Sequence, residues 1–200
     1  DEPLAALDWS RKQEILPWLE RLRDELSVPM LYVTHSADEM ARLADRVICF
    51  ERGAIVAEGP LEDVLLERWP GQGDQGASAV VSGVVTERSS RWCTASVLAQ
   101  DAVFEVADAG RDVGETVRLR ILARDVSVAL TESKDSSIRN ILPAIVTGMR
   151  GIDADSHVML TLEAGGCRML SRITRRSADE LGIDVGVRLY AQVKAAAIIV

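Results

Sequence analysis

Apolar residues in the first 69 positions recur mostly every three or four residues, the spacing of one face of a helix. The clearest stripe, formed by Ile15, Leu19, Leu22 and Leu26, predicts a helix over residues 9–26 that buries this face. Residues 27–69 contain short apolar runs separated by glycine turns. They predict, in order, a buried strand at 30–34, a helix at 36–44, a hairpin of strands at 46–50 and 55–57, and a helix at 61–68 with Val64 and Leu65 inward.

From residue 79 onward, apolar and polar residues alternate, which is the period of a strand with one buried face. Alternating runs occupy residues 115–122, 156–163 and 187–190, with glycine or aspartate between them. Many short strands separated by such turns are typical of small barrels. This part of the chain is therefore predicted to be an all-β, OB-like barrel region.

The β-rich region also repeats internally. Asp112-Val113-Gly114 precedes the run at 117–130, and Asp184-Val185-Gly186 precedes a similar run at 187–200; a gap of two residues aligns the two copies. In this alignment Arg124 corresponds to Lys194. Two copies of one strand unit predict either paired five-stranded barrels or one intertwined double barrel.

Residues 70–79 have the composition of a flexible linker. Gly71, Gly73 and Gly76 satisfy the G-x-G-x-x-G spacing of dinucleotide sites, but a helix precedes them and a β-branched run follows, the reverse of what that motif needs. We therefore predict four segments, which are an α/β unit at 1–69, a linker at 70–79, a first barrel half at 80–135 and a second at 136–200.

Composition narrows the possible functions. The net charge of −8 and the pI near 4.9 disfavour general nucleic-acid binding, and 4% aromatic residues leave few stacking platforms. The three cysteines, Cys49, Cys93 and Cys167, lack the spacing of a zinc site or a disulfide framework. Because no apolar run approaches the roughly 20 residues of a membrane span and no signal peptide is recognisable, we expect a cytosolic protein.

The chain opens with chemistry suited to a metal-bound phosphate. Asp1 could hold Mg²⁺, directly or through water, and Glu2 could orient an attacking water. Together with LYVTHSADEM at 31–40, the opening DEPLAALD resembles the Walker B, D-loop and H-loop of ABC transporter ATPases. That resemblance extends through residue 69. It implies that Asp1 lies on the magnesium side, that Glu2 is the catalytic base, that Ala5 to Asp8 form the D-loop at the bound ATP, and that His35 contacts the γ-phosphate.

The other ATP-binding motifs of this family are absent from the sequence. It contains no G-x-x-x-x-G-K-[ST] motif and no LSGGQ-like signature, and none of its lysines follows a glycine. We therefore expect a fragment that starts inside the Walker B motif and neither binds ATP tightly nor hydrolyses it.

A second group of residues fits a tetrahedral dianion, which needs hydroxyl and backbone N–H donors together with one or two cations. Ser137, Arg139, Thr174 and Lys194 supply that set, although each alone is equally explained as a turn, strand or surface residue. The motifs SIRN, ITRRSADELGI and AQVKA resemble the molybdate- or tungstate-binding Mop domain of the TOBE group. The resemblance implies oxyanion contacts, between subunits or between barrels, from Ser137, Ile138 (backbone), Arg139, Thr174, Lys194 and Ala195 (backbone).

Together these resemblances imply an α/β remnant of a P-loop ABC ATPase domain followed by an all-β OB-like (TOBE/Mop) double barrel. The whole resembles ATP-hydrolysing subunits of ABC importers for molybdate or tungstate. The implied partners are a second copy of the chain and transmembrane permease subunits at the cytoplasmic face of the membrane, with no nucleic acid. Two alternatives remain open, which are an importer subunit for a sugar or sulfate whose barrel binds a regulatory protein, and a Mop-type storage or regulatory protein.

Overall fold

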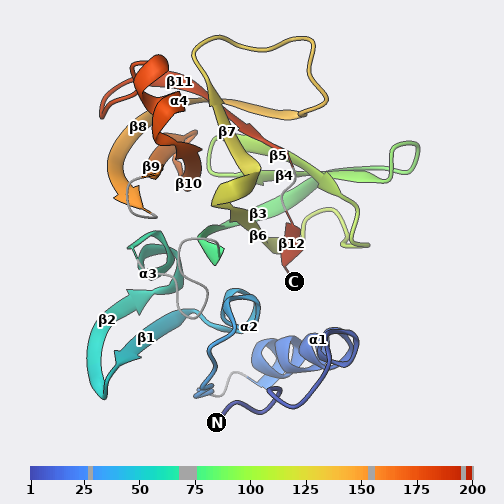
Figure 1. The fold of residues 1–200 in the computed structure, drawn as a ribbon. Helices are drawn as coiled ribbons and strands as arrows, with labels where there is room; N and C mark the ends of the chain where they lie inside the picture. The colour runs from blue at the N-terminus through green and yellow to red at the C-terminus, as the bar shows by residue number, and fades with distance from the viewer. Residues whose placement is uncertain (27–28, 68–75, 153–155, 195–196, 200) are drawn as a thin grey trace.

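The computed structural model describes residues 1–26, 29–67, 76–152, 156–194 and 197–199. Within these residues, an N-terminal part of helices and one hairpin lies below two five-stranded antiparallel sheets in the view of Figure 1. No helix in these ranges has the length and apolar character that a membrane-spanning helix needs.

The elements of the N-terminal part agree closely with the sequence pattern. They are α1 (Trp9–Leu26), α2 (Ala37–Leu43), the hairpin strands β1 (Arg46–Glu51) and β2 (Ala54–Pro60), and α3 (Leu61–Glu67). Ser36 is the N-cap of α2, where its hydroxyl accepts a hydrogen bond from the Glu39 N–H at 3.4 Å. Val64 and Leu65 are buried on α3, as predicted.

The predicted buried stripe of α1 is wrong. Leu22 and Leu26 are 48% and 57% exposed, whereas Leu16 is buried against Leu4 and Leu43. The face that packs is therefore the one turned toward α2 and the N-terminal turn. Periodicity alone could not choose between these two faces, because both carry leucines at helical spacing.

The predicted strand at 30–34 is also wrong. This segment is extended but belongs to no sheet, and Leu31 is 91% exposed. A strand exists only through pairing, and no described strand lies beside it; the carbonyl of Val33 accepts one hydrogen bond, from the Glu2 N–H at 2.9 Å. The described N-terminal part has only the antiparallel β1–β2 hairpin, so the α/β remnant of a P-loop domain stays a prediction.

The remaining described residues form two five-stranded antiparallel sheets. The elements of this part are β3 (Ser78–Ser89), β4 (Thr94–Ala99), β5 (Ala102–Ala107), β6 (Thr116–Leu122), the 3-10 turn η2 (Ala123–Asp125), β7 (Val126–Ala129), β8 (Asn140–Ile152), β9 (His157–Ala164), β10 (Cys167–Thr174), α4 (Arg175–Glu180), β11 (Arg188–Val193) and β12 (Ala197–Ile199). Residues 68–75, which cover most of the predicted linker and both Gly71 and Gly73, lie outside the described residues.

The two sheets exchange their last strands. One sheet has the order β10-β9-β8-β11-β7 and the other β12-β6-β3-β4-β5. Thus β7 follows β6 in sequence but pairs with β11, and β12 follows β11 but pairs with β6 (Figure 1). This exchange is the intertwining that the internal repeat allowed, whereas closure of the two sheets into a double barrel stays a prediction.

The repeat is visible in its turns. The Gly114 N–H donates to the Val85 carbonyl at 2.8 Å, and the Gly186 N–H donates to the Val146 carbonyl at the same distance. Both glycines have positive φ, 94° and 91°. Each turn therefore needs a residue without Cβ strain, which explains why the sequence repeats glycine at these two places.

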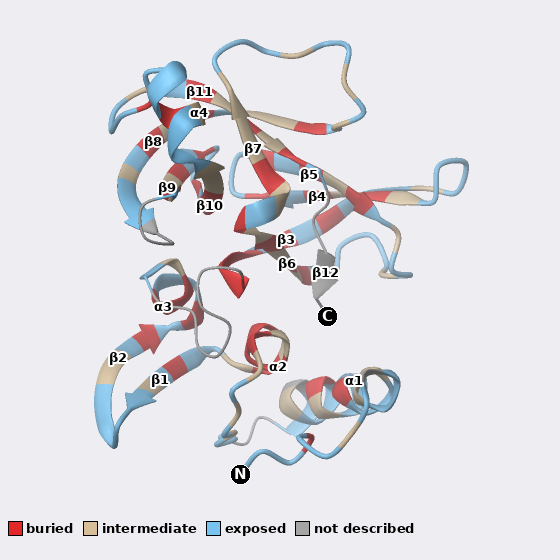
Figure 2. Cartoon of the chain, viewed as in Figure 1, coloured by how far each residue is buried: buried red, intermediate tan, exposed pale blue. Residues whose placement is uncertain are grey.

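The two sheets share one hydrophobic core, which Figure 2 shows as the concentration of buried residues between them. Its fully buried members include Phe104, Leu119, Ile121, Leu160, Leu162 and Met169. Burying a side chain of this size stabilises by roughly 2 kcal/mol. The N-terminal part contacts the barrel through ion pairs of Arg118 with Asp45, Arg120 with Asp38 and Arg168 with Asp63.

Candidate functional site

Glu2 and His35 are in direct contact. The Nδ1 atom of His35 lies 2.7 Å from Oε1 of Glu2, although the two residues are 33 positions apart in the chain. Their side chains are 71% and 43% exposed, so both face solvent. A carboxylate bonded to an imidazole can hold the ring orientation and remains accessible to an incoming phosphate or water.

A buried carboxylate holds the segment that carries His35. Glu39 is 2% exposed and accepts hydrogen bonds from the Thr34 hydroxyl at 2.6 Å, the Lys12 ammonium at 2.8 Å and the Tyr32 hydroxyl at 3.2 Å. Burial alone would raise the pKa of Glu39, but these donors outweigh it and hold the pKa below its usual range. The Glu39 carboxylate is thus turned toward this network and not toward the backbone of Ser36, whose N–H donates to the Thr34 hydroxyl at 3.0 Å.

Asp1 and Asp8, the other residues predicted to lie at the bound nucleotide, make fewer contacts. Asp8 caps α1, since its Oδ1 accepts a hydrogen bond from the Arg11 N–H at 2.9 Å. Asp1 is exposed. In the described ranges, no three His, Cys, Asp or Glu side chains gather as a metal site. Asp1 could supply one ligand to Mg²⁺, which fits an ion held mainly by substrate phosphates and water.

The register of the second sheet brings two of the predicted oxyanion residues together. Asn140 pairs with Val193 in the antiparallel β8–β11 ladder, so Arg139 directly precedes β8 and Lys194 directly follows β11 at the same end of this strand pair. Both are exposed, and the Lys194 N–H donates to the Asp125 carbonyl at 3.1 Å. Two exposed cationic residues thus flank the same end of the β8–β11 strand pair.

The rest of the SIRN motif lies in the loop that leads into β8. Ser137 is exposed, and the Ile138 N–H donates to the Ser136 hydroxyl at 3.1 Å. An anion would have to compete for that N–H. Ala195 lies outside the described residues.

Thr174 is far along the sheet from Arg139 and Lys194. It pairs with His157, which in turn pairs with Ile152, at the opposite end of β8 from Asn140. At a rise of roughly 3.3 Å per residue, β8 is long enough to separate these ends widely within one chain. Within this chain, Thr174 is the N-cap of α4, and its hydroxyl accepts a hydrogen bond from the Ser177 N–H at 3.1 Å.

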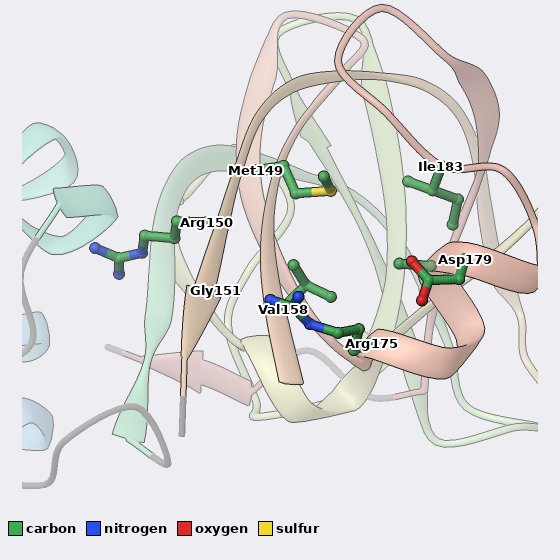
Figure 3. A pocket seen from close by; sticks show the side chains of 8 residues that line it. Met149, Arg150, Gly151, Val158, Arg175, Asp179 and Ile183 are labelled. Carbon is green, nitrogen blue, oxygen red and sulfur yellow. The ribbon is translucent and has the colours of Figure 1, made fainter. Parts of the chain in front are cut away.

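A cavity of about 160 Å³ lies beside Thr174, between β8, β9 and α4. Figure 3 shows the Asp179 carboxylate directed into it and the Arg175 side chain extending toward Val158, while Arg150 points away. The lining thus contains charges of both signs, from Asp179, Arg150 and Arg175. None of the predicted oxyanion residues lines this cavity.

Sequence reasoning assigned no role to Asn140 or Glu105. Asn140, 4% exposed, donates to the Glu105 carbonyl at 2.9 Å and accepts the Glu105 N–H at 2.7 Å. The Glu105 carboxylate lies 3.4 Å from the Nε atom of Arg139. The position of a polar residue at the start of a strand was the only sequence feature that could have pointed to a role for Asn140. No feature of the sequence pointed to a role for Glu105.

Known proteins resemble this chain over its whole length. Residues 136–200, which contain β8 to β12, match the TOBE domain family, so this part of the chain is a TOBE domain. Molybdenum import ATP-binding protein ModC 1 of Azotobacter vinelandii is 45% identical over 200 residues, covering 100% of this chain and 55% of the relative. ModC of Methylococcus capsulatus is 43% identical over 199 residues, covering 99% of this chain and 56% of that protein.

The chain thus belongs to the family of molybdenum import ATP-binding proteins and corresponds to their C-terminal portion. It spans about half the length of the curated relatives it matches. Among solved structures, the cytoplasmic molybdate-binding protein ModG with molybdate bound is 23% identical with a TM-score of 0.47, covering 60% of this chain and 92% of that chain.

Proposed function

We propose that this chain is part of the ATP-hydrolysing subunit of an ABC importer for molybdate or tungstate, and that its TOBE domain binds the oxyanion as a regulatory ligand. The similarity to import ATP-binding proteins over the whole chain supports the transport role. The observation that carries the anion-binding role is the register of β8 and β11, which makes Arg139 and Lys194 neighbours at one barrel edge.

On the ATP side, Glu2 acts as the general base and His35, bonded to it at 2.7 Å, contacts the γ-phosphate. The buried Glu39 network keeps the His35 segment in position. Bound Mg²⁺ would neutralise charge on the transferred phosphoryl group, with Asp1 as a protein ligand. Because no phosphate-binding lysine motif occurs in the sequence, the 200-residue chain alone does not hydrolyse ATP.

On the anion side, Arg139 and Lys194 supply charge, and Ser137 with the backbone of Ile138 and Ala195 supplies neutral donors. Thr174, at the other end of β8, reaches the same anion from a second copy of the chain. The oxyanion therefore binds between two subunits. Such a ligand regulates transport only if it binds two arrangements of the dimer with different affinities.

The whole subunit associates with transmembrane permease subunits and acts at the cytoplasmic face of the membrane. Closure of two ATP-binding domains drives the permease, and bound molybdate biases the dimer toward a resting arrangement. A chain that binds no oxyanion would instead favour the alternative importer, whose barrel binds a regulatory protein.

Isothermal titration of sodium molybdate into the purified chain tests the anion site. We expect binding by the wild type and a loss of at least tenfold in affinity for Lys194→Ala, since a charged hydrogen-bond donor to a dianion is removed. Lys134→Ala, which removes the same charge from the exposed loop before β8, is the matched control and should bind normally. Equal affinity of wild type and Lys194→Ala would reject Lys194 as a ligand.

A further inference from the structure

Arg139 already has an anionic neighbour in the protein. Its Nε atom lies 3.4 Å from Oε1 of Glu105, and the two side chains are 73% and 40% exposed. Arg139 comes from the loop before β8 in the second barrel half, whereas Glu105 is on β5 in the first. The guanidinium that the oxyanion needs is thus shared with a carboxylate from the other half of the barrel.

The neighbouring residue fixes this pairing. Asn140 follows Arg139 directly, and its buried amide bonds both the N–H and the carbonyl of Glu105, at 2.7 and 2.9 Å. Because β5 is the edge strand of its sheet, Asn140 takes the place of a further strand there. The backbones of Arg139 and Glu105 therefore cannot separate without breaking these two part-buried hydrogen bonds, whereas their side chains can rearrange.

We infer that Glu105 is an affinity-determining residue of the oxyanion site, an internal counter-ion that holds Arg139 until a tetrahedral dianion displaces it. This inference rests on the proposed function, since it assumes that Arg139 binds the oxyanion. When the anion binds, Arg139 exchanges the Glu105 carboxylate for the anion, and the carboxylate turns to solvent. A dianion gains more charge attraction from Arg139 than a monoanion does, so the exchange favours doubly charged oxyanions.

The size of the effect follows from the exposure of the pair. An exposed ion pair contributes little, and a carboxylate near a dianion adds a modest repulsion that salt screens. Because Glu105→Gln removes both the ion pair and this repulsion, we expect it to bind molybdate about three- to tenfold more tightly than the wild type at low ionic strength. The gain should shrink in 0.5 M NaCl, where the Debye length falls to about 4 Å.

Isothermal titration of the purified chain with molybdate tests the inference with four proteins, which are wild type, Glu105→Gln, Arg139→Gln and the double variant. The substitution at Glu105 leaves the backbone bonds to Asn140 in place, so matched thermal melts should report an intact fold. We expect tighter binding for Glu105→Gln, and no such gain when the same change is made in the Arg139→Gln background. Glu58→Gln, at an exposed position of β2, a strand that lies well away from β5 in Figure 1, is the control for net charge.

Each outcome bears on one claim. Unchanged or weaker binding by Glu105→Gln would overturn the inference while leaving the oxyanion site intact. An equal gain in both backgrounds, or with Glu58→Gln, would also overturn it, because the effect would then come from net charge. Absence of binding in every protein, wild type included, would overturn the proposed function and the inference with it.

Discussion

The side-chain amide of Asn140 bonds both backbone polar groups of Glu105, accepting its N–H at 2.7 Å and donating to its carbonyl at 2.9 Å. An amide has the same donor and acceptor as a peptide group, so this one buried side chain continues the hydrogen bonding of β5 where its sheet ends. It thereby ties the first residue of the TOBE domain's β8 to the preceding barrel half.

Asn140→Ala should lower the free energy of unfolding by about 1–3 kcal/mol, because the two part-buried hydrogen bonds to the backbone of Glu105 are lost. Urea denaturation monitored by tryptophan fluorescence or circular dichroism measures this loss. Gln192→Ala, a change of another amide on the neighbouring strand β11, serves as the control and should change stability by less than about 0.5 kcal/mol. An equal loss of unfolding free energy in both variants would show that the hydrogen bonds from Asn140 to Glu105 do not contribute this stability.

The Glu39 network should make stability depend on pH. Its pKa is held below the ordinary value of 4.5, so the stabilisation is complete above pH 4.5 and is lost as pH falls through the lower, folded-state value. Glu39→Gln should therefore be less stable than wild type by about 2 kcal/mol at pH 7, and the difference should narrow toward pH 3. Unfolding curves at several pH values provide the test.

Glu14→Gln, at an exposed position of α1, is the charge-matched control for Glu39. Its free energy of unfolding should differ little from that of the wild type at every pH between 7 and 3. A gap between wild type and Glu39→Gln that stays constant from pH 7 to pH 3 would contradict the role of an ionised Glu39.

The two repeated turns should respond alike to substitution. An alanine Cβ at Gly114 or Gly186 meets nothing within 4 Å, so the cost of Gly→Ala comes only from the positive φ. We expect each alanine variant to lose about 1–2 kcal/mol, and Gly186→Asn to lose less, because asparagine tolerates positive φ better. Thermal or urea unfolding decides this, and an unaffected Gly186→Ala would argue against the strained turn.

Local features of this fold were predictable, whereas long-range ones were not. The helix at 9–26, the hairpin at 46–60 and the alternating strands were predictable because each reflects a local period or turn residue. The buried face of α1 was not, since two leucine stripes compete and only packing against Leu4 and Leu43 selects one. The strand at 30–34 failed because strand formation depends on a neighbour that the pattern of one segment does not specify.

In the candidate site too, local motifs were predictable from the sequence and long-range contacts were not. Motif resemblance identified Glu2, His35, Arg139 and Lys194, and the fold joins them in two close pairs. It could not indicate that Thr174 lies at the far end of β8, because that separation depends on strand register. Nor could it find Glu105, whose importance arises only from a contact between the two barrel halves.

A catalytic role for Glu2 predicts a specific defect in the longer protein. When residues 1–200 are joined to the phosphate-binding segments of the ATPase, Glu2→Gln should lower ATP turnover by about 10²- to 10³-fold and leave ATP binding intact, since a general base is lost but charge and shape change little. Phosphate release and nucleotide binding are the two measurements. Full turnover in this variant would remove Glu2 from the mechanism.

The central claim is that one oxyanion is bound by Arg139 and Lys194 of one copy and Thr174 of another. Molybdate titration of an equimolar mixture of Lys194→Ala and Thr174→Val chains, after subunit exchange, tests it most directly. Neither variant alone should bind well. In the mixture, half of the dimers pair unlike chains, and each such dimer has one site with both residues native. Recovery of about a quarter of the wild-type sites is the predicted result, whereas no recovery on mixing would contradict a site shared between two chains.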